Sequence, residues 1–342
     1  MTPRLTPVDT LLGLAGRSGA TAPFPGVAAA LAARLRADGA SPLVTFYDDA
    51  TGERIELSAI TLDNWVAKTA NLLVDTLGLA PGDRVGVDLP VHWLAVVVLL
   101  GAWSAGCEVL VATGPGRDDT GEAPADPAED DQDEADGWPD GRLGGAAQAL
   151  FVAESRVDAA LGLGADEVVA LSLRPFGARM AHPVAGVLDF AAEVPAHGDR
   201  FAAPAPPPGQ AALLARAGEV AAFAGLGRGD RLLSTAGPAS PEGLLATVLA
   251  PLAVGASVVL CRHLDANLDD AALARRIAAE KVTIVGGTAR AAPAGIRRLR
   301  LPEELARMAP STQAPERDDR DGDPPGFSPF AGRLRRPGGT VP

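Results

Sequence analysis

Alternating apolar and polar positions early in the chain predict a β-hairpin followed by a helix. Two β-prone runs, Leu43 to Asp48 and Arg54 to Leu57, flank the turn-forming segment Asp49 to Gly52. Ser58 comes next and is a residue type that caps the N-terminus of a helix. The apolar positions after it recur at spacings of three and four, which predicts a helix with one core-facing stripe: Leu62, Trp65, Val66, Thr69, Leu72 and Leu73.

A longer pattern occurs twice along the chain. Leu77 to Val87 reads L-G-L-A-P-G-D-R-V-G-V, and Ala224 to Ser234 reads A-G-L-G-R-G-D-R-L-L-S. Each copy predicts a Gly-Asp turn, a strand, an apolar helix, a glycine that ends the helix, and a second strand. The turn aspartate and the stop glycine are 23 positions apart in one copy, Asp83 to Gly106, and 25 in the other, Asp230 to Gly255.

These repeated units indicate the fold class. Strands that are apolar on both faces and alternate with helices are typical of parallel sheets between helix layers. A third unit has a predicted helix at Leu268 to Glu280 and a strand at Val282 to Val285, and Glu167 to Leu173 is a further strand candidate. We therefore predict an α/β fold of layered, mostly parallel sheets with covering helices, built from two pseudo-repeated units joined by right-handed crossovers.

Composition divides the chain into ordered and disordered parts. Residues 114–142 concentrate acidic side chains among Gly, Pro and Ala, and residues 301–342 lack periodicity, so we predict an acidic disordered insert and a disordered tail. The ordered remainder is a first α/β half at 1–113 and a second at 143–300. Within the second half, Pro204 to Gly209 reads P-A-P-P-P-G and is predicted to form neither a helix nor a central strand.

Charge and cysteine content exclude several classes of protein. The formal net charge of −13 argues against a nucleic-acid partner and against an anionic membrane surface. Cys107 and Cys261 are too few for a disulfide framework, and their apolar surroundings predict two buried thiols. The longest apolar run, Leu94 to Trp103, is half of what a membrane span requires, so we expect a soluble, cytoplasmic protein.

Catalytic and metal-binding patterns do not stand out. The four histidines are scattered without the spacing of a zinc site, and no G-x-S-x-G elbow is present, so we predict no catalytic residue and no metal ligand. His92 follows the predicted strand Val85 to Leu89, near the end where open α/β sheets bind ligands, but a structural role is favoured. The chain has only two lysines, Lys68 and Lys281, which we expect on the surface.

Several motifs resemble the N-terminal domain of the adenylate-forming (AMP-binding, acyl-CoA synthetase and ligase) superfamily. The hairpin, the helix T-L-D-N-W-V-A-K-T-A-N-L-L and the turn P-G-D-R-V resemble that family's opening block. A later block is similar in G-D-R, L-A-P-L-x-x-G-A-x-V-V-L and E-K-V-T. The two matches cover roughly Leu43 to Ala112 and Gly225 to Thr288, and the chain is most similar to an actinobacterial group of short AMP-binding-like proteins.

The chain departs from the family where the chemistry would lie. Between the two blocks, the resemblance implies a Ser/Thr/Gly-rich phosphate loop with a lysine. This interval instead ends in the prolines of Pro204 to Gly209, which lack the N–H that a phosphate cradle uses, and it contains no lysine. The family's Y-G-x-T-E and T-G-D motifs and its C-terminal domain with a catalytic lysine would follow the second block, where the low-complexity tail lies instead.

We therefore expect a catalytically degenerate relative of these enzymes, lacking the phosphate loop and the C-terminal domain, with a binding or regulatory role. Two alternatives stay open: an AMP-forming acyl- or aminoacyl-adenylating ligase completed by a partner protein, and an interaction scaffold that forms a homodimer or binds another protein. ATP or AMP with Mg²⁺ is expected as a cofactor only if the superfamily's activity is retained.

Two small, polar strand ends form the candidate ligand-binding site. One is Ser234 to Gly237 and the other is Gly286 to Thr288. In the resembled family, the position of Gly286 to Thr288 borders the region that binds the acyl substrate. Because the carboxyl ends of parallel strands meet at one edge of a sheet, the two could border a cleft there. Ordinary strand-to-loop turns that need small residues are the alternative. The candidate residues are Ser234, Thr235, Gly237, Gly286, Gly287 and Thr288.

Overall fold

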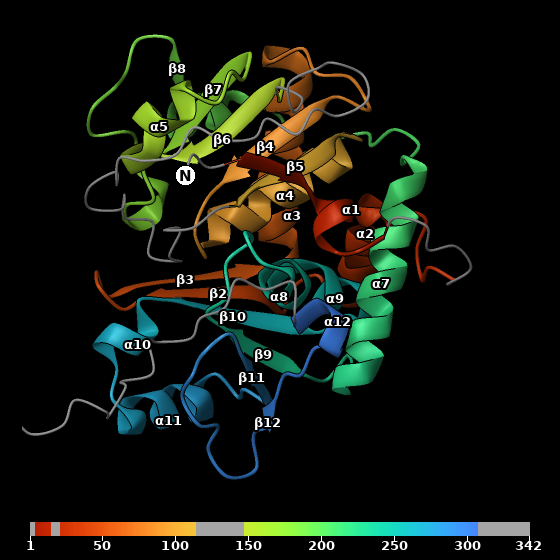
Figure 1. Ribbon diagram of the computed structural model, residues 1–342, viewed down its shortest axis with the longest axis vertical. Helices are drawn as coiled ribbons and strands as arrows, with labels where there is room; N and C mark the ends of the chain where they lie inside the picture. Colours follow the sequence, from red (N-terminus) through yellow and green to blue (C-terminus); the bar gives the residue numbers. More distant parts are fainter. Residues whose placement is uncertain (1–3, 15–20, 114–146, 307–342) are drawn as a thin grey trace, which may run out of the picture. The chain divides into compact units, whose positions relative to one another are not determined.

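Two six-stranded sheets with surrounding helices make up the part of the chain that the computed structural model describes, residues 4–14, 21–113 and 147–306 (Figure 1). These residues belong to one unit, Met1–Pro310. The first sheet has the order β1-β5-β4-β6-β7-β8, and only its edge strand β1 runs antiparallel to its neighbour. Its strands are β1 (Arg4–Pro7), β4 (Arg84–Asp88), β5 (Glu108–Thr113), β6 (Ala149–Ala153), β7 (Glu167–Leu171) and β8 (Val187–Asp189).

The second sheet has the order β12-β11-β9-β10-β2-β3, and again a single edge strand, β3, is antiparallel. Its strands are β2 (Pro42–Asp48), β3 (Glu53–Ser58), β9 (Arg231–Ser234), β10 (Ser257–Arg262), β11 (Ile284–Gly286) and β12 (Arg297–Arg298). The predicted α/β class with layered, mostly parallel sheets is confirmed. Each sheet combines strands from both predicted halves, since β2 and β3 join the second sheet and β6 to β8 join the first. The boundaries of the halves stay a prediction.

The helices cover the sheets and also lie between them. They are α1 (Val8–Leu11), α2 (Val27–Asp38), α3 (Ala59–Asn71), α4 (Trp93–Ser104), α5 (Val157–Leu161), α6 (Phe190–Glu193), α7 (Pro208–Ala224), α8 (Pro241–Leu244), α9 (Ala250–Val254), α10 (Leu264–Asn267), α11 (Asp270–Ala279) and α12 (Glu303–Ala306). One π-helical segment, Leu72–Thr76, continues α3, and another, Leu245–Leu249, joins α8 to α9. None of the helices in the described ranges is long and apolar enough to cross a membrane.

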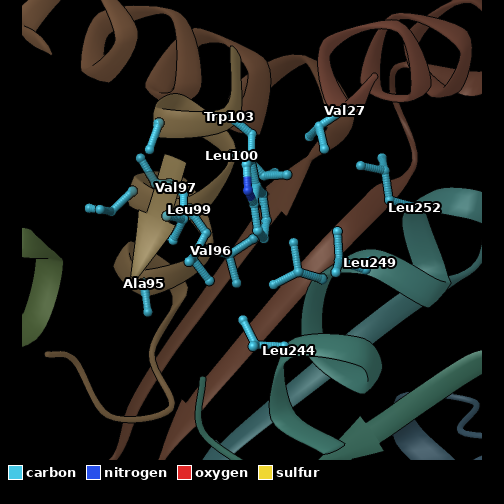
Figure 2. Close-up of a cluster of buried hydrophobic side chains, with 14 of the residues drawn as sticks. Val27, Ala95, Val96, Val97, Leu99, Leu100, Trp103, Leu244, Leu249 and Leu252 are labelled. Carbon is cyan, nitrogen blue, oxygen red and sulfur yellow. The ribbon is translucent and has the colours of Figure 1, made fainter. Parts of the chain in front are cut away.

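Helix α4 is the centre of the core. Every one of its residues is buried, and it contacts β4 and β5 of the first sheet as well as β2 of the second. Figure 2 shows its side chains facing Leu244, Leu249 and Leu252, which belong to the helical segment between β9 and β10. An apolar helix with no polar face is stable only when it is covered on all sides, and the two sheets and their helices provide that cover.

The predicted hairpin and capped helix are both present. Strands β2 and β3 pair antiparallel, and the hydroxyl of Ser58 accepts a hydrogen bond from the backbone N–H of Thr61 at 3.1 Å. Within the predicted stripe of α3 and its continuation, only Trp65 is not fully buried. It packs edge-on against Trp93 of α4, with ring centroids 5.3 Å apart, which is the core-facing role expected of it.

The repeated sequence pattern corresponds to two equivalent turns. In the first, a carboxylate oxygen of Asp83 accepts a hydrogen bond from the N–H of Ala80 at 2.7 Å; in the second, Asp230 accepts one from Gly227 at 2.8 Å. The stop glycines, Gly106 and Gly255, have φ values of +84° and +77°. Both copies therefore form the predicted sequence of turn, strand, helix, glycine and strand, β4-α4-β5 in the first and β9 to β10 in the second.

Some predicted boundaries need correction. Pro204 to Gly209 is not free of helix, because α7 begins at Pro208: a proline in the first turn of a helix loses no hydrogen bond. The strand predicted at Glu167 to Leu173 ends at Leu171, since Leu173 has a left-handed backbone with φ of +53°. In the third unit, the helix predicted from Leu268 begins after its cap at Asp269, and the strand predicted from Val282 begins at Ile284.

The two predicted disordered segments fall mostly outside the described residues. This applies to the acidic insert at 114–142 and to residues 307–342 of the tail. The first residues of the predicted tail are described, and they form α12, whose Leu305 is 1% exposed. The packed part of the chain therefore extends beyond residue 300.

Candidate functional site

The six predicted ligand-binding residues come together at the carboxyl edge of the second sheet. Strands β9 and β11 are parallel neighbours, and Ser234 and Gly286 are register partners at their ends. Directly beyond them, the hydroxyl of Thr235 donates a hydrogen bond to the carbonyl of Gly287 at 2.5 Å. Thr288 follows with 2% of its surface exposed. The strand pairing thus joins two segments that lie about 50 positions apart in the sequence.

Protein groups already bind the polar atoms at this edge. The N–H of Gly287 donates to a carboxylate oxygen of Glu242 at 2.7 Å, and the hydroxyl of Thr288 donates to Asp265 at 2.7 Å. The hydroxyl of Ser234 accepts from the N–H of Ala236 at 3.2 Å. Two carboxylates therefore lie where an anionic ligand would need hydrogen-bond donors.

The edge is also packed at close range, because α8 lies against the loop that follows β9. A Cβ atom placed on Gly243 of α8 would lie 1.7 Å from the carbonyl oxygen of Gly237. A Cβ on Gly287, whose φ is +72°, would lie 2.5 Å from the backbone nitrogen of Ala236. Small residues are therefore required here for the close approach of three backbone segments, which agrees with the structural alternative for these glycines.

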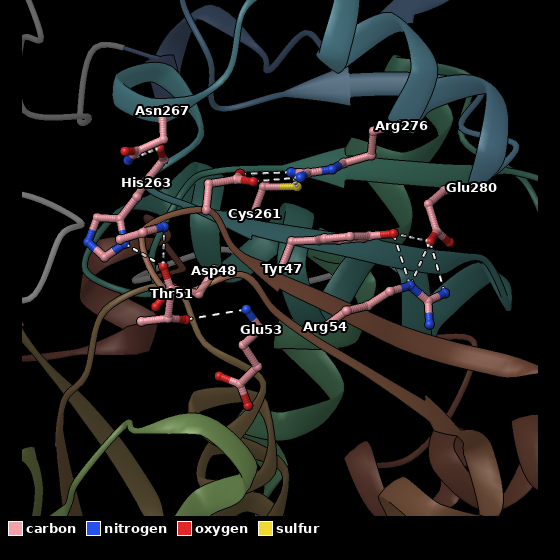
Figure 3. Close-up of polar contacts among 12 residues, drawn as sticks. Tyr47, Asp48, Thr51, Glu53, Arg54, Cys261, His263, Asn267, Arg276 and Glu280 are labelled. Carbon is pink, nitrogen blue, oxygen red and sulfur yellow. Dashed lines mark hydrogen bonds and ion pairs between the residues drawn. The ribbon is translucent and has the colours of Figure 1, made fainter.

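A second polar cluster lies at the same edge, at the ends of β2 and β10 (Figure 3). His263 donates from Nδ1 to Asp48 at 2.6 Å, and Arg262 lies 3.8 Å from the other oxygen of that carboxylate. Burial alone would raise the pKa of Asp48, but the hydrogen bonds from His263 and from the N–H of Ala50 outweigh it, and the pKa is lowered. Asp48 is therefore ionised at neutral pH although it is 3% exposed.

The sequence did not single out this cluster. Asp48 and Arg262 are register partners on parallel strands, yet more than 200 positions separate them. No local spacing connects them, and His263 looks isolated in the sequence. The one available signal is that both residues directly end β-prone runs.

Glu53 adds a carboxylate with an unusual environment to this cluster. Its side chain is buried; one oxygen accepts a hydrogen bond from the N–H of Phe176 at 2.8 Å, and the other has no hydrogen-bond partner among the described residues. Burial raises the pKa of Glu53, and the neighbouring charge of Asp48 raises it further. Phe176 itself is 81% exposed and has a left-handed backbone.

Replacing Glu53 by glutamine is expected to stabilise the protein at neutral pH, by up to about 1 kcal/mol, because a neutral amide costs less to bury than an ionised carboxylate. Glutamine keeps an oxygen that can accept from Phe176. A carboxyl group whose pKa is raised by folding destabilises the fold once it ionises, so the advantage of E53Q should disappear as the pH falls below that pKa. Urea unfolding at pH 7 and pH 4 measures this; an equal effect at both values would contradict the role assigned to the charge.

His92 has a structural role. It is 1% exposed, and its Nδ1 accepts a hydrogen bond from the N–H of Leu94, which caps α4. Burial lowers the pKa of His92 to about 3, with a smaller effect from the charge of Arg262, so the imidazole is neutral at physiological pH. This agrees with the structural interpretation of His92 favoured from the sequence.

The other reactive residue types also have structural surroundings. Cys107 and Cys261 are both buried, as predicted, and burial raises the pKa of each thiol to about 12. Lys68 is half-buried and pairs with Asp199 at 2.8 Å, whereas Lys281 is exposed. Within the described ranges, no group of three or more His, Cys, Asp or Glu side chains is arranged to hold a metal ion.

Solved structures with a similar fold include an acyl-CoA synthetase, a benzoate CoA ligase and a nonribosomal peptide synthetase. An acyl-CoA synthetase from Brucella canis aligns with 82% of this chain and 50% of its own, with a TM-score of 0.54 and 18% identity. A benzoate CoA ligase from Burkholderia xenovorans aligns with 77% and 50%, with a TM-score of 0.52 and 17% identity. The nonribosomal peptide synthetase FmoA3 aligns with 81% of this chain and 27% of its own, with a TM-score of 0.53 and 18% identity. At this identity the likeness concerns the fold, and this chain spans half or less of each protein.

One curated protein is related in sequence. It is described as a TIGR03089 family protein of Mycobacterium tuberculosis, and it is 43% identical over 258 residues, which are 73% of this chain and 93% of the relative. The aligned segment makes up a larger fraction of the relative than of this chain, so the relative is the shorter protein. No protein-family model matches the sequence.

Proposed function

The chain belongs to the TIGR03089 family, and from this premise we propose that it is a binding or regulatory protein that has the fold of the adenylate-forming enzymes without their chemistry. The observation that carries this proposal is the contact between Glu242 and the N–H of Gly287 at the carboxyl edge of the second sheet. An adenylating enzyme must stabilise negative charge on the departing pyrophosphate, which requires free N–H groups, hydroxyls or cations.

The residues around this edge do not fit a nucleoside triphosphate. Glu242 would repel the phosphates, Arg290 is already paired with Asp265, and the two strand-end donors nearest to these carboxylates are engaged by them. In the segment where the enzymes have their phosphate loop, this chain has the prolines that precede and begin α7, and their nitrogens carry no hydrogen. We therefore assign no reaction step to ATP or Mg²⁺.

The six strand-end residues stay a predicted ligand site within this proposal. A ligand that used the N–H of Gly287 would first have to displace Glu242. Asp265 is paired with Arg290 at 3.1 Å, so the repulsion at this edge comes from Glu242, next to which an uncharged or cationic group would be favoured over a phosphate.

A pyrophosphate assay tests the absence of adenylation. The purified full chain is incubated with ATP, Mg²⁺ and a panel of aliphatic, aromatic and amino acids, with heat-denatured chain as the control. We expect no pyrophosphate release above the control and no heat of binding on titration with AMP. Substrate-dependent release by the native chain would refute the proposal.

One observation favours a second candidate function, an AMP-forming ligase completed by another polypeptide. The likeness in fold to an acyl-CoA synthetase and a benzoate CoA ligase supports this candidate, in which another polypeptide supplies the parts of those enzymes that this chain does not match. Pyrophosphate exchange that depends on this chain in cell extract, and that is absent with the purified chain, would favour this candidate over the first.

A further inference from the structure

A hollow of about 260 Å³ opens at the amino edge of the second sheet, opposite to the carboxyl edge described above. It lies between α2 and α9, and the turn that precedes β9 closes one end of it. We call it the α2–α9 hollow. The residues that matter for its chemistry are Phe24, Ala33, Arg34, Arg228, Leu252 and Gly255.

Arg34 supplies a buried cation to the α2–α9 hollow. Its side chain is 8% exposed, and one terminal nitrogen donates to the backbone carbonyl of Asp38. Its Nε is buried and has no hydrogen-bond partner among the described residues. A buried N–H of a charged group that lacks an acceptor is costly, so a shift of the Arg34 side chain towards a ligand oxygen in the hollow would be favourable.

Arg228 supplies a second guanidinium at the mouth of the hollow. It is exposed, and its side chain lies across Gly255, with Nε 3.5 Å and Cγ 3.7 Å from the position that a Cβ of residue 255 would take. Asp38 is close to both arginines: a hydrogen bond from Ser41 is the main reason that its pKa is lowered, and the charges of Arg34 and Arg228 contribute. Two cations and one carboxylate leave a net charge of +1 at this end.

The rest of the wall is apolar. Phe24, Ala33 and Leu252 line the space next to the two arginines. Its volume of about 260 Å³ lies just below the range of about 300–1,000 Å³ that is usual for small-molecule pockets, so it suits a small ligand. The combination of an apolar wall with a single net positive charge suits a ligand that has one anionic head and an apolar body.

We propose that the α2–α9 hollow binds an amphiphilic anion, with a carboxylate or phosphate head held by Arg34 and Arg228 and a short apolar body against Phe24, Ala33 and Leu252. Guanidinium groups suit this head because they donate two parallel hydrogen bonds to carboxylate or phosphate oxygens. This site is on the opposite edge of the sheet from the six strand-end residues. Binding there does not depend on whether the protein adenylates.

Calorimetric titration of the full chain with octyl phosphate, octanoate and octanol tests the proposal. At least one of the two anions should bind ten times or more tightly than octanol, and comparison of the anions identifies the preferred head group. R228A should weaken that binding at least tenfold. R36A is the matched control, since Arg36 is exposed on the same helix and does not line the hollow; it should change affinity by less than twofold.

A second pair of variants separates binding in the hollow from attraction to surface charge. A33L fills the space without changing a charge and should weaken binding at least tenfold, whereas A37L places the same side chain on the exposed face of α2 and should have no effect. Circular dichroism confirms that the variants are folded. Equal affinity for octanol and the anions, unchanged binding by A33L, or no binding of either anion at millimolar concentration would overturn the proposal.

Discussion

Substitution of Gly243 by alanine is expected to destabilise the protein by at least about 3 kcal/mol. The added Cβ would lie 1.7 Å from the carbonyl oxygen of Gly237 and 2.4 Å from its carbonyl carbon, and both are backbone atoms that no rotamer change can move. Relief requires α8 to separate from the loop after β9. Overpacking of this kind costs about 1–3 kcal/mol when side chains can adjust, and more when they cannot.

Gly218 provides the matched control for this substitution. It also lies in a helix, α7, but no atom lies within 4 Å of a Cβ placed on it. There, alanine should stabilise the protein by about 0.5–1 kcal/mol, because it is the better helix former. Chemical denaturation of both variants measures the two effects. A G243A protein as stable as the wild type would show that α8 does not approach the loop as closely as described.

Glu280 is the second position where a large loss is expected, because it pairs with cations from two strands; Figure 3 shows its contacts with Arg54 and Tyr47. Its carboxylate lies 2.7 Å from Arg231 of β9 and 2.9 Å from Arg54 of β3, and it also accepts a hydrogen bond from the hydroxyl of Tyr47. E280Q leaves the largely buried Arg231 without its carboxylate. Removal of one partner from a buried pair typically costs about 3 kcal/mol or more.

The effect of E280Q should depend on pH. Burial opposes ionisation of Glu280, but the hydrogen bonds from Tyr47, Arg231 and Arg54 outweigh it and lower the pKa to about 2. The stabilisation is therefore complete above the ordinary glutamate pKa of about 4.3 and is lost as the pH falls towards 2.

Urea unfolding of the wild type and E280Q between pH 7 and pH 2 tests this. The difference between the two proteins should shrink steadily below pH 4. E56Q is the control: Glu56 pairs with the same Arg54 at 2.7 Å, but both side chains are about 40% exposed, so the cost should be about 0.5 kcal/mol or less. A loss as large for E56Q as for E280Q would contradict the importance given to burial.

Local elements of this fold could be predicted because each has its own signal in the sequence. The hairpin, the Ser58 cap and the two Gly-Asp turns follow from residue types at fixed short spacings. The start of α7 was missed because a proline-rich string was interpreted as a break throughout, whereas Pro208 occupies the first helical position, where proline is tolerated.

Long-range pairing could not be predicted in the same way. Nothing in the periodicity of the β2 segment indicates that it lies beside β10, and the Asp48–His263 contact depends entirely on that pairing. The meeting of β9 and β11 was anticipated only because both strand ends were expected at one edge of a parallel sheet. Which groups satisfy the polar atoms there, Glu242 above all, depends on how α8 packs, and local spacing carries no information about that.

The position of α4 has a consequence for how the protein is made. This almost wholly apolar helix leaves the ribosome long before the helical segment that carries Leu244, Leu249 and Leu252, which its side chains face, has been synthesised. At roughly 5–20 residues per second, the nascent chain exposes α4 for many seconds before Leu252 is added. During translation this segment is therefore an obvious binding site for chaperones, and premature termination before β10 should yield a product prone to aggregation.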